Sequence, residues 1–159
     1  MRGERGFSLI EGMLAMAILA TGLLGLASMQ IYALGGNVDA DEMTRVTNLG
    51  MDMVERIQFN RRNALAYNGI DTTNPCVIDA AAQPMARGDC DQWRTLLTGN
   101  FAAGLGGLRG QVASVAVGPA APALNQSRVT VTMTWTGAAG TGKPAKSKRL
   151  AITTVVAPE

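Results

Sequence analysis

The residue types that most often carry chemistry are scarce in this chain of 159 residues. Histidine, the commonest general base and metal ligand, is absent. The two cysteines, Cys76 and Cys90, are too few for a four-thiolate zinc site. These counts exclude catalytic triads, haem sites and metalloenzymes that are built on histidine. We expect neither a catalytic site nor a metal or other cofactor.

One stretch is close to a phosphate-binding loop. Residues 137–143 read GAAGTGK, which resembles the pattern G-x-x-x-x-G-K-[ST]. The next residue is Pro144, where the pattern needs a hydroxyl for Mg²⁺, and an expected strand follows in place of the phosphate-holding helix. We interpret the stretch as a hairpin loop with a basic edge. The formal charge of +2 adds no general attraction for nucleic acid, and DNA binding stays open.

The isolated carboxylate of Glu11 is the most informative chemical group. It is the single charge in residues 7–34, a run long enough for a membrane-spanning helix of about 20 residues. Arg2 and Arg5 precede the run, so its start is expected in the cytoplasm and the rest of the chain outside. An ionised side chain at the bilayer centre costs about 2.5–3.5 kcal/mol. Glu11 lies near one end, where the cost is lower, but it still calls for a partner.

Two simpler explanations of this segment stay open. A cleaved signal peptide would have a basic start and small residues such as those near Ala27, although its apolar core is usually only about 7–15 residues. A helix cap would explain the carboxylate, because Ser8 and Glu11 fit the capping box S-x-x-E at the positive end of a helix dipole. A cap does not explain the short basic leader that ends in Gly6.

The stretch RGFSLIEGM resembles the type III signal of type IV prepilins and pseudopilins. The resemblance implies that a prepilin peptidase on the cytoplasmic side cuts after Gly6 and N-methylates the new first residue, Phe7. The family's glutamate falls on Glu11, which implies a role in assembly. The segments GLLGLASMQ and DMVERIQFNRRNALAYN are more specifically similar to the PilV family of minor pilins, the type IV pilus modification proteins.

This resemblance implies a structural protein that helps to initiate or modify pilus assembly. Its partners would be the prepilin peptidase, the major pilin, other minor pilins and the inner-membrane assembly platform, with no small-molecule substrate. The chain would cross the inner membrane once, with a cytoplasmic N-terminus and a periplasmic head, and then enter the pilus. A type II secretion pseudopilin is the alternative, and a membrane-tethered periplasmic enzyme is a more distant one. A head that binds an adhesion ligand or DNA is compatible with the pilus role.

A helical pattern continues beyond the apolar run. Apolar residues recur every three or four positions, at Met43, Val46, Gly50, Met53 and Ile57, and Leu49 and Val54 widen that face. Two acid-before-base pairs four residues apart are expected on the outer surface, Asp41/Arg45 and Asp52/Arg56. The pattern predicts one helix from residue 7 to about residue 62.

Small residues lie at helical spacing in the apolar half. Ala17, Thr21 and Gly25 are four positions apart, a spacing that lets membrane helices approach closely. Gly22 and Gly25 each cost about 1 kcal/mol relative to alanine in a helix. They are candidates for helix packing, or for a stretch that unwinds when subunits pack, and ordinary membrane-helix glycines are the alternative.

After Tyr67 the composition becomes rich in residues that form loops, and both cysteines lie in this region. Outside the cytoplasm a Cys76–Cys90 disulfide is the default. Closing a loop of about 15 residues is worth about 3 kcal/mol in the chain-entropy model. Two free thiols are the alternative, and the Cys-x-x-Cys spacing of a redox pair is absent.

The remaining sequence predicts a short helix, an irregular stretch and three strands. The helix is expected at 91–97, the irregular glycine-rich stretch at 101–110, and the strands at 111–117, 129–136 and 149–156. The order predicts an α+β, type IV pilin-like fold, in which the second half of the long helix packs against a small antiparallel sheet. The expected segments are a leader (1–6), a transmembrane helix (7–34), its amphipathic continuation (35–66), a loop region with the disulfide (67–110) and the sheet (111–159).

Overall fold

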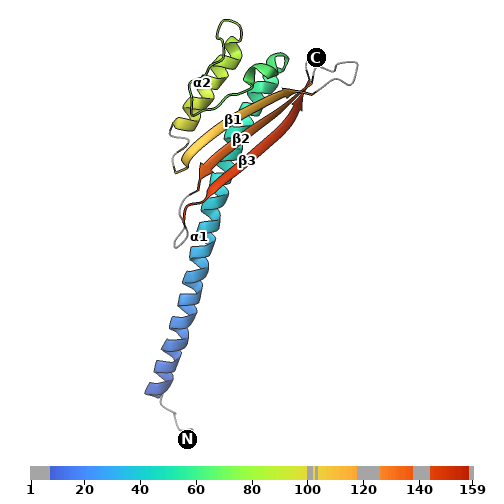
Figure 1. Cartoon of the computed structure of the whole chain (residues 1–159). Helices are drawn as coiled ribbons and strands as arrows, with labels where there is room; N and C mark the ends of the chain where they lie inside the picture. Colours follow the sequence, from blue (N-terminus) through green and yellow to red (C-terminus); the bar gives the residue numbers. More distant parts are fainter. Residues whose placement is uncertain (1–7, 100–101, 103, 118–125, 138–143, 158–159) are drawn as a thin grey trace. The chain divides into compact units, whose positions relative to one another are not determined.

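The computed structural model describes residues 8–99, 102, 104–117, 126–137 and 144–157. The elements along the chain are α1 (Leu9–Phe59), the 3-10 helix η1 (Arg61–Tyr67), α2 (Pro84–Thr98), β1 (Gly106–Ala116), β2 (Ser127–Thr136) and β3 (Ser147–Val156). Figure 1 shows these elements coloured along the sequence. The chain divides into two compact units, residues 1–38 and 39–159, and α1 contributes to both. The long N-terminal helix and the small antiparallel sheet confirm the predicted α+β, pilin-like fold.

In the second unit, one face of α1 is buried against the rest of the head. The predicted apolar period holds for most of this face, whose buried members are Val46, Leu49, Gly50, Met53, Val54 and Ile57. Met43 was predicted to open the stripe, but its side chain is 46% exposed. Glu42 takes the buried position one residue earlier, because a lysine and a tryptophan of the sheet bind its carboxylate.

Helix α1 ends at Phe59, slightly before the predicted residue 62. The amide side chain of Asn60 donates to the hydroxyl of Tyr67 at 3.1 Å, and its carbonyl oxygen accepts from Asn63 at 3.0 Å. Asparagine side chains that bond in this way compete with the regular helical ladder. The chain therefore changes from the α-helix to the 3-10 helix η1, in which Asn63 departs from helical dihedral angles.

The three strands form one antiparallel sheet in the order β1-β2-β3. In the register, Val131 of the central strand faces Val112 on β1 and Ile152 on β3. The strict alternation predicted for residues 129–136 is present, since the apolar side chains of β2 are buried and its threonines lie on the opposite face. The sheet packs on α1 through Gly50, where an added Cβ would lie 2.9 Å from Cδ1 of Ile152.

The first strand begins earlier than predicted, because its glycines have structural uses. β1 starts at Gly106, so the prediction of an irregular stretch over 101–110 is wrong from that residue onward. The register shifts between Gly106 and Arg109, and Gly107 has a positive φ of 57°. At Gly110 an added Cβ would lie 2.2 Å from Cη2 of Trp93, so only glycine fits beneath that ring.

Helix α2 is also longer than the predicted 91–97. It begins at Pro84, at the N-terminal position where proline is favoured. Trp93 is fully buried and donates its indole N–H to the carbonyl oxygen of Leu49 at 2.8 Å. This bond and the packing of Leu97 join α2 to the shared core of the head.

Candidate functional site

The N-terminal turn of α1 holds the first candidate site. The backbone N–H of Ser8 donates to Oε2 of Glu11 at 3.0 Å, and the carbonyl oxygen of Ser8 accepts from the N–H of Glu11 at 3.0 Å. The first of these bonds is the glutamate half of the capping box that the S-x-x-E pattern predicts, and the second uses the backbone carbonyl of Ser8 in place of its hydroxyl. It uses one carboxylate oxygen and leaves Oε1 of Glu11 without a partner among the described residues. Gly6 and Phe7, the predicted processing residues, lie outside the described residues.

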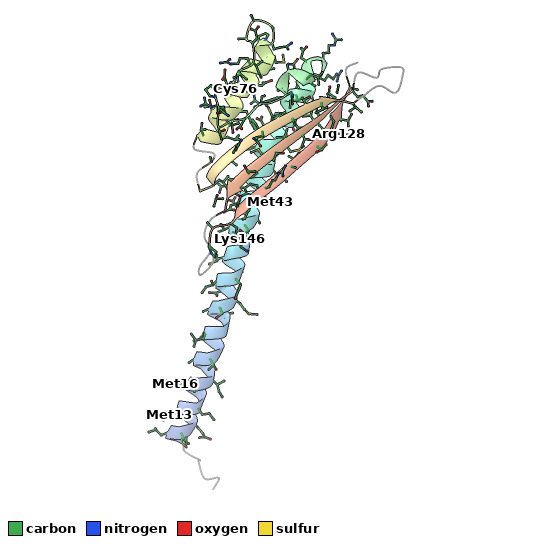
Figure 2. All side chains as sticks on the ribbon, viewed as in Figure 1. Met13, Met16, Met43, Cys76, Arg128 and Lys146 are labelled. Atoms are coloured by element: carbon green, nitrogen blue, oxygen red, sulfur yellow. A yellow bond between two sulfur atoms is a disulfide. The ribbon has the colours of Figure 1, made fainter. Side chains whose placement is uncertain are left out.

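Over residues 12–38 the described helix carries no charged side chain, and apolar side chains lie on all its sides. Its large apolar side chains are exposed, and Figure 2 shows Met13 and Met16 projecting from it. Helix α1 is long and apolar enough to cross a membrane, with a mean hydropathy of 2.0 in its best window. A helix that is apolar all round needs lipid or other protein around it.

The two glycines of this segment have no close neighbour among the described residues outside their own helix. An added Cβ at Gly22 or Gly25 would meet no atom within 4 Å. The hydroxyl of Thr21 donates to the carbonyl oxygens of Ala17 and Ile18, at 3.2 and 2.9 Å, so the polar group is satisfied inside the helix. The helix is continuous through both glycines, and no unwinding is present in the single chain.

In the second unit the two cysteines are joined. Cys76 and Cys90 form a disulfide with a Cα–Cα distance of 6.1 Å, and both residues are buried. The bond ties the irregular segment after η1 to the middle of α2. Beside it, Tyr67 donates to Oδ2 of Asp89 at 2.5 Å, and burial together with this hydrogen bond raises the pKa of Tyr67 well above its usual range.

A charged cluster that the sequence analysis missed joins the sheet to α1. Lys148 of β3 donates to Asp39 at 2.7 Å and to the buried carboxylate of Glu42 at 2.8 Å. The indole N–H of Trp135 points at the same Glu42 oxygen from 3.4 Å. The hydrogen bonds to Asp39 and Glu42 raise the pKa of Lys148 above its usual value. Glu42 lies four residues before Val46 and seven before Leu49, so its position in the sequence places it on the buried face of the helix. The apolar pattern missed it because only apolar residues were counted in that pattern.

A second ion pair fixes the segment that follows η1. Arg109 of β1 binds the carboxylate of Asp71 through two nitrogens, and Gln111 and Thr73 donate to the same carboxylate. Burial alone would raise the pKa of Asp71, but these hydrogen bonds outweigh it and lower the pKa below the usual range. The two pairs predicted on α1 also form, Asp41–Arg45 at 3.0 Å and Asp52–Arg56 at 2.9 Å.

Within the described part of the chain, no group of three or more histidine, cysteine, aspartate or glutamate residues is placed to hold a metal ion. Of the loop that resembles a phosphate-binding pattern, residues 138–143 lie outside the described residues.

The comparisons with known proteins agree with the geometry of the N-terminus. Residues 1–27 match the family model of the prokaryotic N-terminal methylation motif. No curated protein and no solved structure matches the chain. The motif indicates a structural subunit rather than an enzyme, and it implies interaction with the prepilin peptidase and pilus components in general. Together with the long apolar helix that precedes a small α+β head, the motif supports a membrane-anchored protein of the pilin or pseudopilin type.

Proposed function

We propose that the chain is a minor pilin of the type IV pilus, of the PilV family, which helps to initiate or modify pilus assembly. The observation that carries this proposal is the methylation motif over residues 1–27, which runs directly into the apolar half of α1. A soluble domain has no use for a helix whose first half is exposed and apolar on all sides. A filament subunit buries that surface, first in the membrane and then among its neighbours.

Processing precedes assembly in this proposal. The prepilin peptidase cuts between Gly6 and Phe7, removes the leader 1–6 and methylates the amine of Phe7. Arg2 and Arg5 hold the leader in the cytoplasm, residues 7–34 cross the inner membrane, and the head lies in the periplasm. The mature chain is then drawn into the pilus by the inner-membrane assembly platform, next to the major pilin and other minor pilins.

Glu11 supplies the charge that guides this step. After cleavage, the cationic amine of Phe7 lies at the same helix end as Glu11, on its own chain and on every neighbouring subunit. A carboxylate in an apolar environment is poorly tolerated alone and well tolerated beside a cation. Pairing with the amine of an adjacent subunit would align the incoming chain along the filament axis. The geometry at Glu11 supports this role, because the cap at Ser8 occupies Oε2 and no described residue binds Oε1.

Close helix packing is the second part of the proposal. Gly22 and Gly25 have open space around them, so no contact with the described residues explains their small size. With Ala17 and Thr21 they form a strip on which a neighbouring helix can approach closely. The head, with its disulfide loop region (67–110) and its sheet (111–159), would then meet the heads of other subunits.

Loss of the chain tests this function directly. A strain without it should assemble few pili, and re-expression should restore them, with the chain itself present in sheared pilus fractions. The level of major pilin in the membrane is the control, because it should not change. Normal piliation with a loss of protein secretion would instead identify a type II secretion pseudopilin and contradict the proposal.

A further inference from the structure

The two edges of the sheet differ in how they are covered. Beyond β1, residues 68–72 run along the edge and pair with it. The N–H of Gly69 donates to the carbonyl oxygen of Val112 at 3.0 Å, and the N–H of Val112 donates to the carbonyl oxygen of Ile70 at 2.9 Å. The N–H of Thr72 donates to the carbonyl oxygen of Gly110 at 3.0 Å, so the middle of this edge is covered.

The outer edge of β3 has no such cover from the residues that the structure describes. Among the described residues, no backbone hydrogen bond joins β3 to any segment other than β2. The strand is 10 residues long, and its register with β2 runs without a bulge from Ser147 to Val156. Exposed edges are usually protected by short length, bulges, proline, charged side chains along the edge or an inward-pointing charge, and of these β3 has only its charges, Lys148 and Arg149. The inward charge on β3, Lys148, is already bound by Asp39 and Glu42.

The side chains of β3 show what a further strand would meet. Toward α1, Leu150 and Ile152 are only half-buried and pack at the rim of the core. A neighbouring strand with apolar side chains on this face would complete their burial. On the opposite face, Arg149 and Thr153 are exposed and Val155 is 53% exposed.

The positive charge on this edge favours a partner that carries a negative charge. The described parts of residues 104–157, which include all three strands, contain no aspartate or glutamate. Lys146 and Arg149, at the start of β3, have no ion-pair partner among the described residues. Figure 2 shows Lys146 at one end of the sheet and Arg128 at the other. Within the described part of the chain, the start of β3 therefore presents two basic groups without an ion-pair partner, Lys146 and Arg149, whereas Lys148 between them is paired with two carboxylates of α1.

We propose that the open edge of β3 binds an extended segment of a second polypeptide as an added antiparallel strand. The segment has apolar side chains over Leu150 and Ile152, and it has a carboxylate opposite Arg149. Antiparallel pairing continues the pattern of this sheet and is slightly more stable per residue than parallel pairing. It also brings the C-terminal half of the segment to Lys146 and Arg149, so the carboxylate belongs in that half.

In strand addition, the backbone and the side chains make different contributions to binding. The main-chain hydrogen bonds supply affinity, and the alternating side chains supply specificity. A second copy of β3 does not meet these requirements, because it has no carboxylate to place opposite Arg149. The occupant is therefore a different segment, with acidic and apolar residues in alternation.

Two synthetic peptides as long as β3, tested on the full chain in detergent micelles, decide the matter. Both alternate valine and threonine, and they differ only in a glutamate or a lysine at the position that faces Arg149. Hydrogen exchange should show new protection of the β3 amides, with the glutamate peptide binding about two- to fivefold more tightly, as for one exposed cross-strand ion pair. With Arg149→Glu, the lysine peptide should bind more tightly than the glutamate peptide. A glutamate peptide that is N-methylated along its pairing edge should give no protection.

Arg62→Glu is the matched control, because it makes the same charge change on an exposed residue of η1. In this variant the glutamate peptide should still bind more tightly than the lysine peptide. The proposal is overturned if no peptide protects β3, or if Arg149→Glu leaves the preference unaltered. Without any peptide, protection of β3 could rise with the concentration of the chain. That result would identify a second copy of the chain as the occupant and would also overturn the proposal.

Discussion

The carboxylate of Glu11 accepts a hydrogen bond from the backbone N–H of Ser8 at 3.0 Å, across the first turn of α1. The cap uses one carboxylate oxygen, Oε2, so it is compatible with the assembly role that we propose for Glu11. The two roles also need different properties. The cap needs an acceptor oxygen, whereas recruitment of a cationic amine needs the negative charge.

Substitutions at Glu11 separate these two roles. Glu11→Gln keeps an acceptor for the Ser8 N–H and removes the charge, whereas Glu11→Ala removes both. Both variants should insert into the membrane at least as well as the native chain, since a charge leaves the apolar segment. Both should be strongly depleted from sheared pilus fractions on immunoblots. Native amounts of Glu11→Gln in the pili would mean that Glu11 is only a cap.

The Cys76–Cys90 bridge should be fully oxidised in the cell. Thiol labelling of the denatured, unreduced protein should find no free cysteine. The double replacement of Cys76 and Cys90 by serine should lower the free energy of unfolding by about 3 kcal/mol, the value for a loop of this size. Quantitative labelling of both thiols, or an unchanged midpoint of denaturant unfolding in the double variant, would contradict this prediction.

The buried Glu42 should depend on Lys148. Lys148→Met removes the ammonium group that donates to this carboxylate and should cost about 3 kcal/mol, the lower end of the range for a broken buried pair, because Lys148 is itself 30% exposed. Arg149→Met is the control on the same strand and should change stability by no more than about 0.5 kcal/mol. Adding Glu42→Gln to Lys148→Met should recover part of the lost free energy of unfolding. If it does not, the destabilisation by Lys148→Met does not come from the buried charge of Glu42.

The pH dependence of this pair follows from the raised pKa of Lys148. A cation that is stabilised in the folded state contributes its full stability below its unfolded pKa, and the contribution is lost as the pH rises through the folded value. The contribution should therefore persist at pH 10.5, the ordinary lysine value, and fall only above it.

Gly110 should tolerate no side chain. In Gly110→Ala the new methyl group would lie 2.2 Å from Cη2 of the fully buried Trp93, so the ring must move. Overpacking of this kind costs about 1–3 kcal/mol. Ala113→Val, on the exposed face of the same strand, is the control and should be close to neutral. Equal unfolding midpoints for the two variants would refute the close contact.

The sequence predicted the elements whose patterns are local. The alternation along β2 and the three-to-four-residue period of α1 are each set by burial on one face, so they can be found without knowledge of the partner. The disulfide followed from the expected compartment of the head. The capping contact between Ser8 and Glu11 also follows from spacing alone.

The parts that could not be predicted depend on contacts between distant segments. Glu42 is buried because Lys148 and Trp135, more than ninety residues away, satisfy its charge. The start of β1 looked irregular because its glycines were counted as loop residues, whereas Gly110 is small to admit the ring of Trp93. In both cases the reason for the residue lies on another element, which no local pattern contains.

The mass of the mature N-terminus tests the central claim most directly. The chain extracted from membranes of cells that make type IV pili should be digested and its N-terminal peptide identified by mass spectrometry. The account predicts a chain that begins at Phe7 and carries an N-methyl group on that residue, with residues 1–6 absent. A mature start near Ser28 would establish an ordinary signal peptide and would contradict the assignment to the pilins.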